Sequence, residues 1–133
     1  MAKTVFQSSL YRAVETLAMW WIPVGGRTPN TPVLRHYVNV CSGAIDDALT
    51  AIHLGLETNR DAAQERLDCI DTAHVHLTRV KTIVRILKEY SDTNGHARVL
   101  SNKQFAHFSI SMNKIYTELG MWRNATERRI RSH

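Results

Sequence analysis

The residues with the best spacing for metal binding are Asp71 and His74, an Asp-x-x-His pair with Asp68 one turn earlier. A di-iron site in a helical bundle needs a Glu-x-x-His pair from each of two helices and two further carboxylates, because facing helices share each ion. The chain contains no second pair, and His76 is two residues from His74 and so projects to another side of a helix. We therefore expect a solvated helix face here and no metal site.

Candidate nucleophiles and phosphate-binding loops also lack their partner residues. Cys41 falls among the apolar residues of a predicted helix without a His-based signature, and the same holds for Cys69, so structural thiols are expected. Gly25-Gly26 lacks the Lys and Ser/Thr of a phosphate loop, and no G-x-S-x-G or H-E-x-x-H pattern occurs. The sequence thus predicts a protein that is not an enzyme and that has no cofactor.

Basic residues are the remaining candidates for a functional site. Lys81, Arg85 and Lys88 follow one another at i, i+4 and i+7, which lines them up on one side of a helix. Lys and Arg bind phosphates by displacing condensed counterions, and Arg adds a forked set of donors. A charged face that is only solvated is the equally weighted alternative. The candidate residues for binding a partner or nucleic acid are Arg79, Lys81, Arg85, Lys88, Arg123, Arg128, Arg129 and Arg131.

Charge is distributed unevenly along the chain, whose net charge is +5. Residues 1–71 contain six Lys/Arg against eight Asp/Glu, whereas residues 72–133 contain eleven against four. The positive second half favours polyanionic partners such as RNA, DNA or an acidic protein surface, without choosing among them. The sequence does not support stacking of single-stranded bases, because Trp122 and Tyr116 fall on or beside a predicted core seam.

Breaker residues divide the chain into four helical segments. Gly, Pro and small polar residues cluster at residues 22–30 and 91–96, and the stretch between these clusters has one plausible turn at residues 55–59. The predicted helices run from about residue 4 to 21, from Pro32 after an N-cap at Thr31, from about residue 59 or 60 over about thirty residues, and from an N-cap at Ser101.

Apolar residues recur at spacings of three and four in each segment. The first stripe consists of Phe6, Leu10, Val14, Leu17 and Trp21. In the last segment the steps are 3-4-3-4-3, a seam that packs helices nearly antiparallel, formed by Phe105, Phe108, Met112, Ile115, Leu119 and Trp122. Short connections make sequential helices antiparallel. We therefore predict one domain over residues 1–133, an all-α, antiparallel up-and-down four-helix bundle with a basic C-terminal tail at about residues 123–133.

The two middle segments have apolar residues beyond their main stripes. These extra residues are Val38, Val40, Ile45 and Leu49 in the second segment and Val75, Ile83 and Ile86 in the third. A helix that is apolar on more than one side must bury the extra face within a wide core or against another subunit. Both a wide core and a homo-oligomer therefore remain open.

Length and composition agree with one globular domain. The 133 residues are 44% hydrophobic and 22% charged. No run approaches the ~20 apolar residues that span a bilayer, and the short apolar stretch at residues 19–24 lacks the layout of a signal peptide. Two cysteines are too few for a disulfide framework. We expect a soluble, cytoplasmic protein that does not enter a membrane.

Two parts of the sequence resemble a family of small four-helix-bundle proteins. Residues 100–105, Leu-Ser-Asn-Lys-Gln-Phe, lead into residues 115–122, Ile-Tyr-Thr-Glu-Leu-Gly-Met-Trp, whose Gly-x-Trp ending is the most recognisable piece. Residues 80–87, Val-Lys-Thr-Ile-Val-Arg-Ile-Leu, place Lys81 and Arg85 where the family tends to be basic. The family includes the accessory variability determinant, Avd, of diversity-generating retroelements and proteins encoded in ribosomal-RNA intervening sequences.

The resemblance covers most of the chain in helix order and length. It is loose in the first helix, and neither the pair Trp20-Trp21 nor residues 22–30 match the family pattern. It implies a homopentameric, positively charged barrel that binds the retroelement's reverse transcriptase and RNA or DNA. Such an accessory protein supports mutagenic copying of a template RNA into cDNA, while its partner performs the polymerase chemistry. The alternative is a bundle of the intervening-sequence type, with unspecific nucleic-acid binding and no polymerase partner.

Overall fold

The computed structural model describes residues 8–59, 61–93 and 99–132. Within these ranges the chain forms four α-helices and no strand. They are α1 (Ser9–Arg27), α2 (Pro32–Glu57), α3 (Ala63–Thr93) and α4 (Asn102–Arg131). The predicted all-α four-helix bundle is confirmed. The helix start near residue 4, Phe6 of the first stripe, Arg60, and residues 94–96 of the second breaker cluster lie outside the described residues.

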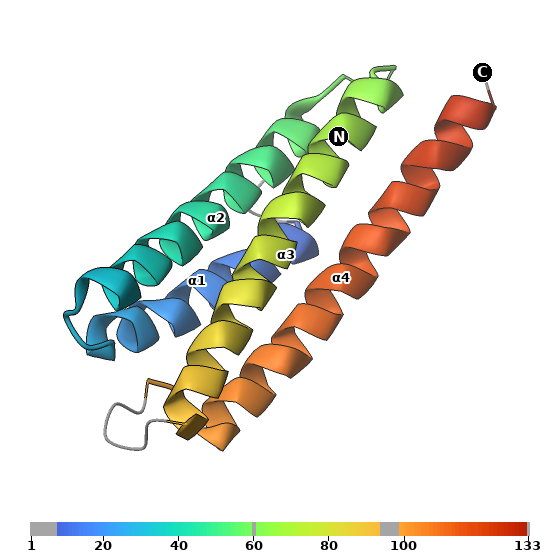
Figure 1. The fold of residues 1–133 in the computed structure, drawn as a ribbon. Helices are drawn as coiled ribbons and strands as arrows, with labels where there is room; N and C mark the ends of the chain where they lie inside the picture. The colour runs from blue at the N-terminus through green and yellow to red at the C-terminus, as the bar shows by residue number, and fades with distance from the viewer. Residues whose placement is uncertain (1–7, 60, 94–98, 133) are drawn as a thin grey trace.

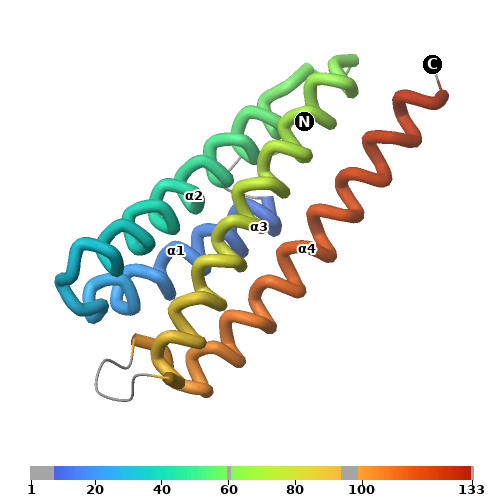
Figure 2. The backbone as a smooth tube through the Cα atoms, viewed as in Figure 1, coloured from blue at the N-terminus to red at the C-terminus, as the bar shows by residue number. Residues whose placement is uncertain are grey.

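The helices are arranged in chain order around the bundle. α1 packs against α2, α2 against α3 and α3 against α4, and α4 closes the bundle against α1. Figures 1 and 2 show that successive helices run in opposite directions along a common long axis. The up-and-down topology follows from the short connections, because each one returns the chain beside the helix that it leaves.

The predicted N-caps of α2 and α4 are confirmed. The Thr31 hydroxyl accepts a hydrogen bond from the Leu34 N–H at 3.4 Å, and Pro32 occupies the first turn of α2. Ser101 forms a capping box with Gln104: its hydroxyl accepts from the Gln104 N–H, and the Gln104 side chain accepts from the Ser101 N–H. These bonds satisfy donors that a helix N-terminus leaves unpaired.

The prediction that residues 22–30 form a loop is wrong for residues 22–27, because α1 continues through Pro23 to Arg27. Proline costs the helix a backbone donor, but tertiary contacts stabilise this last turn. Gly25 lies so close to α2 that a Cβ would be 3.3 Å from Val38 Cγ1. Arg35 on α2 donates through Nη1 to the Gly25 carbonyl at 3.1 Å, and the Thr28 hydroxyl donates to the Val24 carbonyl at 3.1 Å.

A single core runs along the bundle axis. It contains the predicted stripes of α1 and α4, from Leu10 to Trp21 and from Phe108 to Leu119, with Phe105 and Trp122 packed at its edge. Of the additional apolar residues, Val38, Ile45 and Ile83 are buried, as a wide core requires, and Val40 and Leu49 are partly buried. Val75 and Ile86 are exposed.

The connection between α3 and α4 is fixed by a hydroxyl at the end of α3. Ser91 is buried, and its Oγ accepts hydrogen bonds from the backbone N–H groups of Val99 at 2.9 Å and Leu100 at 3.1 Å. The same hydroxyl donates to the Leu87 carbonyl at 2.9 Å. Ser91 thus joins the last turn of α3 to the residues that precede α4.

Across the part of the chain that the structure describes, no helix has an apolar stretch long enough to cross a bilayer.

Candidate nucleic-acid interface

The residues considered for metal binding have other partners in the structure. Asp71 accepts a hydrogen bond from Arg123, Asp68 accepts one from Gln64, and the ring of His74 lies 5.4 Å from the ring of Tyr116. Within the described ranges, no group of three or more His, Cys, Asp or Glu side chains could hold a metal ion.

The two cysteines are disfavoured as nucleophiles. Burial raises the pKa of Cys41 to about 12 from its ordinary value of 9.0. Burial also raises the pKa of Cys69, and the nearby carboxylates of Asp68 and Glu65 raise it further. Because the thiolate is the nucleophilic form, both residues are protonated and unreactive at neutral pH.

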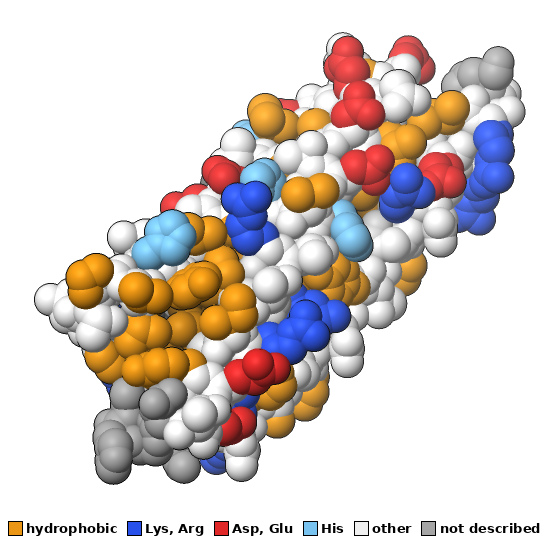
Figure 3. Space-filling view, viewed as in Figure 1, with side chains coloured by type: hydrophobic (Ala, Val, Ile, Leu, Met, Phe, Trp, Pro, Cys, Tyr) orange, Lys and Arg blue, Asp and Glu red, His pale blue; other side chains and the backbone are white. Residues whose placement is uncertain are grey.

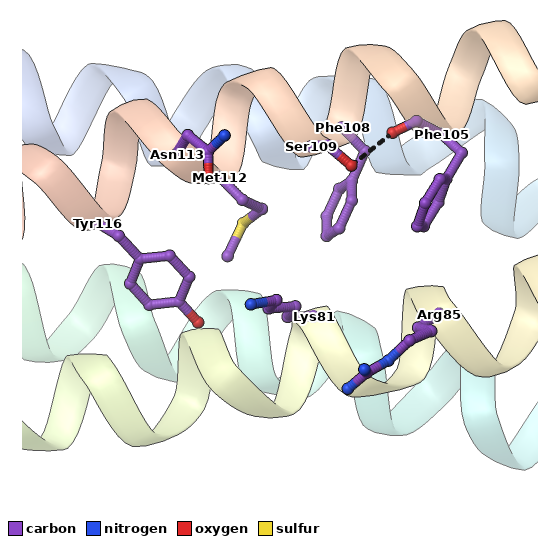
Figure 4. A pocket seen from close by; sticks show the side chains of 8 residues that line it. All are labelled: Lys81, Arg85, Phe105, Phe108, Ser109, Met112, Asn113 and Tyr116. Carbon is purple, nitrogen blue, oxygen red and sulfur yellow. Dashed lines mark hydrogen bonds between the residues drawn. The ribbon is translucent and has the colours of Figure 1, made fainter.

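The feature best suited to binding lies between α3 and α4. Lys81 and Arg85 from α3 face a row of α4 side chains across a hollow of about 140 Å³ (Figure 4). Four of the α4 side chains are aromatic or sulfur-containing and two are polar. The α4 lining consists of Phe105, Phe108, Ser109, Met112, Asn113 and Tyr116.

Stacked rings form the floor of this hollow. The centroids of Phe105 and Phe108 are 6.2 Å apart, and Trp20 of α1 stacks on Phe108 at 5.2 Å. Its neighbour Trp21 is buried and donates through Nε1 to the Ser42 hydroxyl at 2.9 Å. The tryptophan pair that matched no family pattern therefore has two packing roles, one beneath the hollow and one in the core.

Tyr116 forms the boundary of the hollow. Its hydroxyl oxygen lies 3.2 Å from Thr78 Oγ1 on α3, and Lys81 Nζ lies 5.6 Å from its ring centroid. Lys81 and Tyr116 also line a second, wider hollow of about 760 Å³, which continues between the helices past His74 to Arg123. The two hollows are adjacent, with Lys81 and Tyr116 lining both, and together they are here called the α3–α4 groove.

The sequence missed the α4 wall of this groove. Phe105, Phe108 and Met112 of this wall were assigned to the core seam. Ser109, Asn113 and Tyr116 recur at steps of four and three, which places them on one side of α4 beside that seam. Tyr116 was assigned beside the seam, and the structure shows it half-buried in the groove wall. These α4 residues could have been predicted to face Lys81 and Arg85, because α3 and α4 are neighbouring antiparallel helices.

The structure corrects the assignment of Lys88 to a basic surface. Lys88 is buried, forms an ion pair with Asp92 one turn later, and lies 6.0 Å from the ring centroid of Phe105. At ~100° per residue its direction differs from that of Lys81 by only about 20°, so helix rotation does not explain its burial. Lys88 is buried because the Phe105 ring of α4 packs over it and Asp92 pairs with it. The carboxylate of Asp92, also on α3, offsets the positive charge of Lys88.

Arg79 is exposed, but it does not line the α3–α4 groove. It lies two positions before Lys81, so the two side chains point to nearly opposite sides of α3. Arg79 is therefore near Lys81 along the chain, as expected, but on another side of the helix. Among the predicted residues of α3, only Lys81 and Arg85 share the groove.

The basic C-terminal residues lie on the last turns of α4 and do not form one cluster. Arg123 lines the wide hollow but donates through Nε to Asp71 Oδ1 at 2.8 Å and also pairs with Glu127. The hydrogen bond to Asp71 raises the pKa of Arg123. Arg128 and Arg131 line a shared surface hollow, whereas Arg129 lines another beside Trp122.

Figure 3 shows Lys and Arg side chains along the boundary between α3 and α4 and at the end of α4. The fold and the groove define an all-α four-helix bundle with a cationic, aromatic-lined surface. Comparison with models of known families, with curated proteins and with solved structures finds no match for this chain. The resemblance to the family that includes Avd remains a prediction from the residues quoted above.

Proposed function

We propose that this protein is a non-enzymatic accessory protein of a diversity-generating retroelement. In this proposal it acts in the cytoplasm and binds the retroelement's reverse transcriptase and nucleic acid, in support of mutagenic cDNA synthesis. The link to a retroelement is supported by the resemblance of residues 80–87, 100–105 and 115–122. The link to nucleic acid is supported by the α3–α4 groove.

One observation carries the proposal of nucleic-acid binding. Lys81 and Arg85 are exposed one turn apart, and neither forms an ion pair within the described ranges. Their charges are therefore available to a phosphate, whereas those of Lys88 and Arg123 are offset by carboxylates. A free cation beside a phosphate releases a condensed counterion, and this release drives binding to nucleic acid.

We further propose that the chain assembles into a homo-oligomer, a pentamer by the resemblance. Hydrophobic side chains gather over the first turns of α2 and the last turns of α3 (Figure 3). Val33, Tyr37 and Val40 share one side of α2 at steps of four and three, and Ile86 and Tyr90 share one side of α3. Val33 is 66% exposed and Ile86 is 38% exposed, and Tyr37, Val40 and Tyr90 are only partly buried. Light scattering should then give about 76 kDa, five times the chain mass of 15.2 kDa. A native mass of one chain contradicts the assembly.

The test of the proposed function is a double charge reversal. Lys81→Glu with Arg85→Glu should abolish co-purification with the reverse transcriptase encoded beside the gene, and should weaken oligonucleotide binding. Loss of two phosphate contacts should lower the slope of log K against log salt by about 1.4 for a single strand. Arg79→Glu with Lys114→Glu is the matched control, because it makes the same change in net charge at exposed residues outside the groove.

The outcomes separate the possible functions. Unchanged binding in the groove variant, or equal losses in both variants, contradicts the proposed role of Lys81 and Arg85. Binding of oligonucleotides by the wild type without co-purification of any polymerase favours the intervening-sequence type of protein. Circular dichroism of each variant shows whether helicity is retained.

A further inference from the structure

We propose that the α3–α4 groove binds single-stranded nucleic acid by accepting one pyrimidine base into the hollow beside Lys81 and Arg85. This inference rests on the proposed function and adds to it the form of nucleic acid and the way it is recognised. Three features of the groove support it: its size, its lining and the position of its cations.

The hollow has the size of a single ring. Its volume is about 140 Å³, and a protein cavity of about 150 Å³ is known to hold benzene. The hollow is open at the surface, so a pyrimidine ring fits within it, whereas the second ring of a purine would extend beyond it. The size therefore favours a pyrimidine base for the hollow.

The lining provides flat apolar surfaces together with polar groups. The half-buried rings of Phe105 and Tyr116 line the hollow along α4, and aromatic rings stack on the face of any base. The buried thioether of Met112 adds apolar surface. Ser109 donates its hydroxyl hydrogen to the Phe105 carbonyl at 3.1 Å, so its oxygen can still accept a hydrogen bond. The amide of Asn113 offers both a donor and an acceptor, which the edge of a pyrimidine requires.

The cations lie on the opposite wall, where the backbone of a bound nucleotide would pass. Lys81 and Arg85 line the same hollow from α3, so a base between the helices brings its phosphate to these two side chains. Lys81 also borders the wide hollow, so it can hold the phosphate that joins one nucleotide to the next. The next nucleotide then lies in the wide hollow beside Lys81 and His74.

This arrangement excludes a regular duplex from the hollow. Bases in a duplex are stacked and paired inside the helix, so a base enters a protein pocket only when it is unpaired or flipped out at a cost. A duplex can contact Lys81 and Arg85 from outside, through its phosphates alone. The groove should therefore distinguish single strands from duplexes.

The experiment compares three fluorescein-labelled probes of equal length by fluorescence anisotropy: oligo-dT, oligo-dA and a mixed-sequence duplex. The wild type should bind oligo-dT about tenfold more tightly than the duplex, because one stacked base contributes on that scale. It should also prefer oligo-dT to oligo-dA. Polyglutamate, which has the charge but no bases, should compete poorly against oligo-dT.

Three variants separate stacking from charge. Tyr116→Leu removes a ring and should weaken oligo-dT binding about tenfold while leaving duplex binding unchanged. Tyr116→Phe keeps the ring and should bind oligo-dT like the wild type, although it loses the contact with Thr78. Ser109→Phe fills the hollow and should also abolish the preference for oligo-dT. Circular dichroism confirms that each variant is folded.

The failure of this inference is distinguishable from that of the proposed function. Suppose that the wild type binds all three probes equally, that Tyr116→Leu has no effect and that Lys81→Glu with Arg85→Glu weakens every probe. The basic surface then stands, and the base-binding groove is rejected. Equal competition by polyglutamate also rejects it. If the wild type binds no probe, both proposals fail.

Discussion

The two flanks of α3 meet their neighbours differently. Toward α2, Ile83 is buried with 4% exposure, and His76 Nδ1 approaches Asp47 Oδ2 at 4.0 Å. Toward α4, Lys81 and Arg85 stay exposed above a hollow of about 140 Å³. One helix therefore contributes stability on one side and, in the proposal above, a binding surface on the other. Substitutions on the two flanks should have separable effects.

The largest difference is expected for truncation of the two flanks. Ile83→Ala should lower the free energy of unfolding by about 3 kcal/mol, because it leaves a cavity in the core. Arg85→Ala, two residues later on the groove side, should change it by less than about 0.5 kcal/mol, because the side chain is exposed. Urea unfolding measures both values. Similar losses in the two variants would show that the flanks are not separate.

The close packing of α2 can be tested at two of its glycines. A Cβ at Gly55 would lie 2.7 Å from Trp122 Cη2 and 3.2 Å from Cys69 Cβ, whereas a Cβ at Gly43 would meet nothing within 4 Å. Gly55→Val should therefore destabilise the fold by about 2 kcal/mol through overpacking. Gly43→Ala should stabilise it by about 0.5–1 kcal/mol through helix propensity. Thermal unfolding shows whether each variant is more or less stable than the wild type. A stabilised Gly55→Val variant would contradict the close packing around Gly55.

The inner face of α2 can be tested through the thiol of Cys41. Its pKa is about 12 in the folded protein and 9.0 for an ordinary thiol, so above pH 9 only the unfolded chain loses this proton. The contribution to stability is complete below pH 9 and is lost as the pH rises toward 12. Between pH 8 and 10 the wild type should lose about 1 kcal/mol more than Cys41→Ala. Equal losses in urea unfolding at the two pH values would show that Cys41 is solvated.

The smallest effect is expected at Lys88, which the sequence placed on the same line as Lys81. Lys88→Met should change stability by less than about 1 kcal/mol, because a buried ion pair is often no better than a well-packed apolar residue. Its oligonucleotide affinity and salt dependence should equal those of the wild type. Lys81→Met should lower the salt slope by about 0.7 for a single strand. A reduced slope for Lys88→Met would place Lys88 on the binding surface after all.

Local signals in the sequence were sufficient to predict most of the fold. Thr31 and Ser101 mark helix starts because their hydroxyls cap the following turn, which depends on neighbours within three residues. The seam of α4 from Phe108 to Leu119 is buried as its spacing predicts. The end of α1 could not be predicted, because Arg35 and Val38 stabilise Gly25 from another helix.

The candidate site was predicted only in part. Lys81 and Arg85 were found from their spacing, and Asp92, four residues after Lys88, was the available sign that Lys88 is paired. The angular position of Arg79 was also available from its spacing to Lys81. The hollow could not be predicted from the sequence, because it depends on the distance between α3 and α4, which no local sequence pattern determines.

Because of the hydroxyl of Ser91, the position of α4 along α3 does not depend on the length of the connection between the two helices. A side chain of α3 holds Val99 and Leu100 at the end of that helix. These two residues directly precede the capping box at Ser101, so they fix where α4 starts. Adding or removing residues between Thr93 and Val99 should therefore leave the register of α3 and α4 unchanged. The chain length at this end of the molecule can then change while the opposite walls of the groove stay aligned.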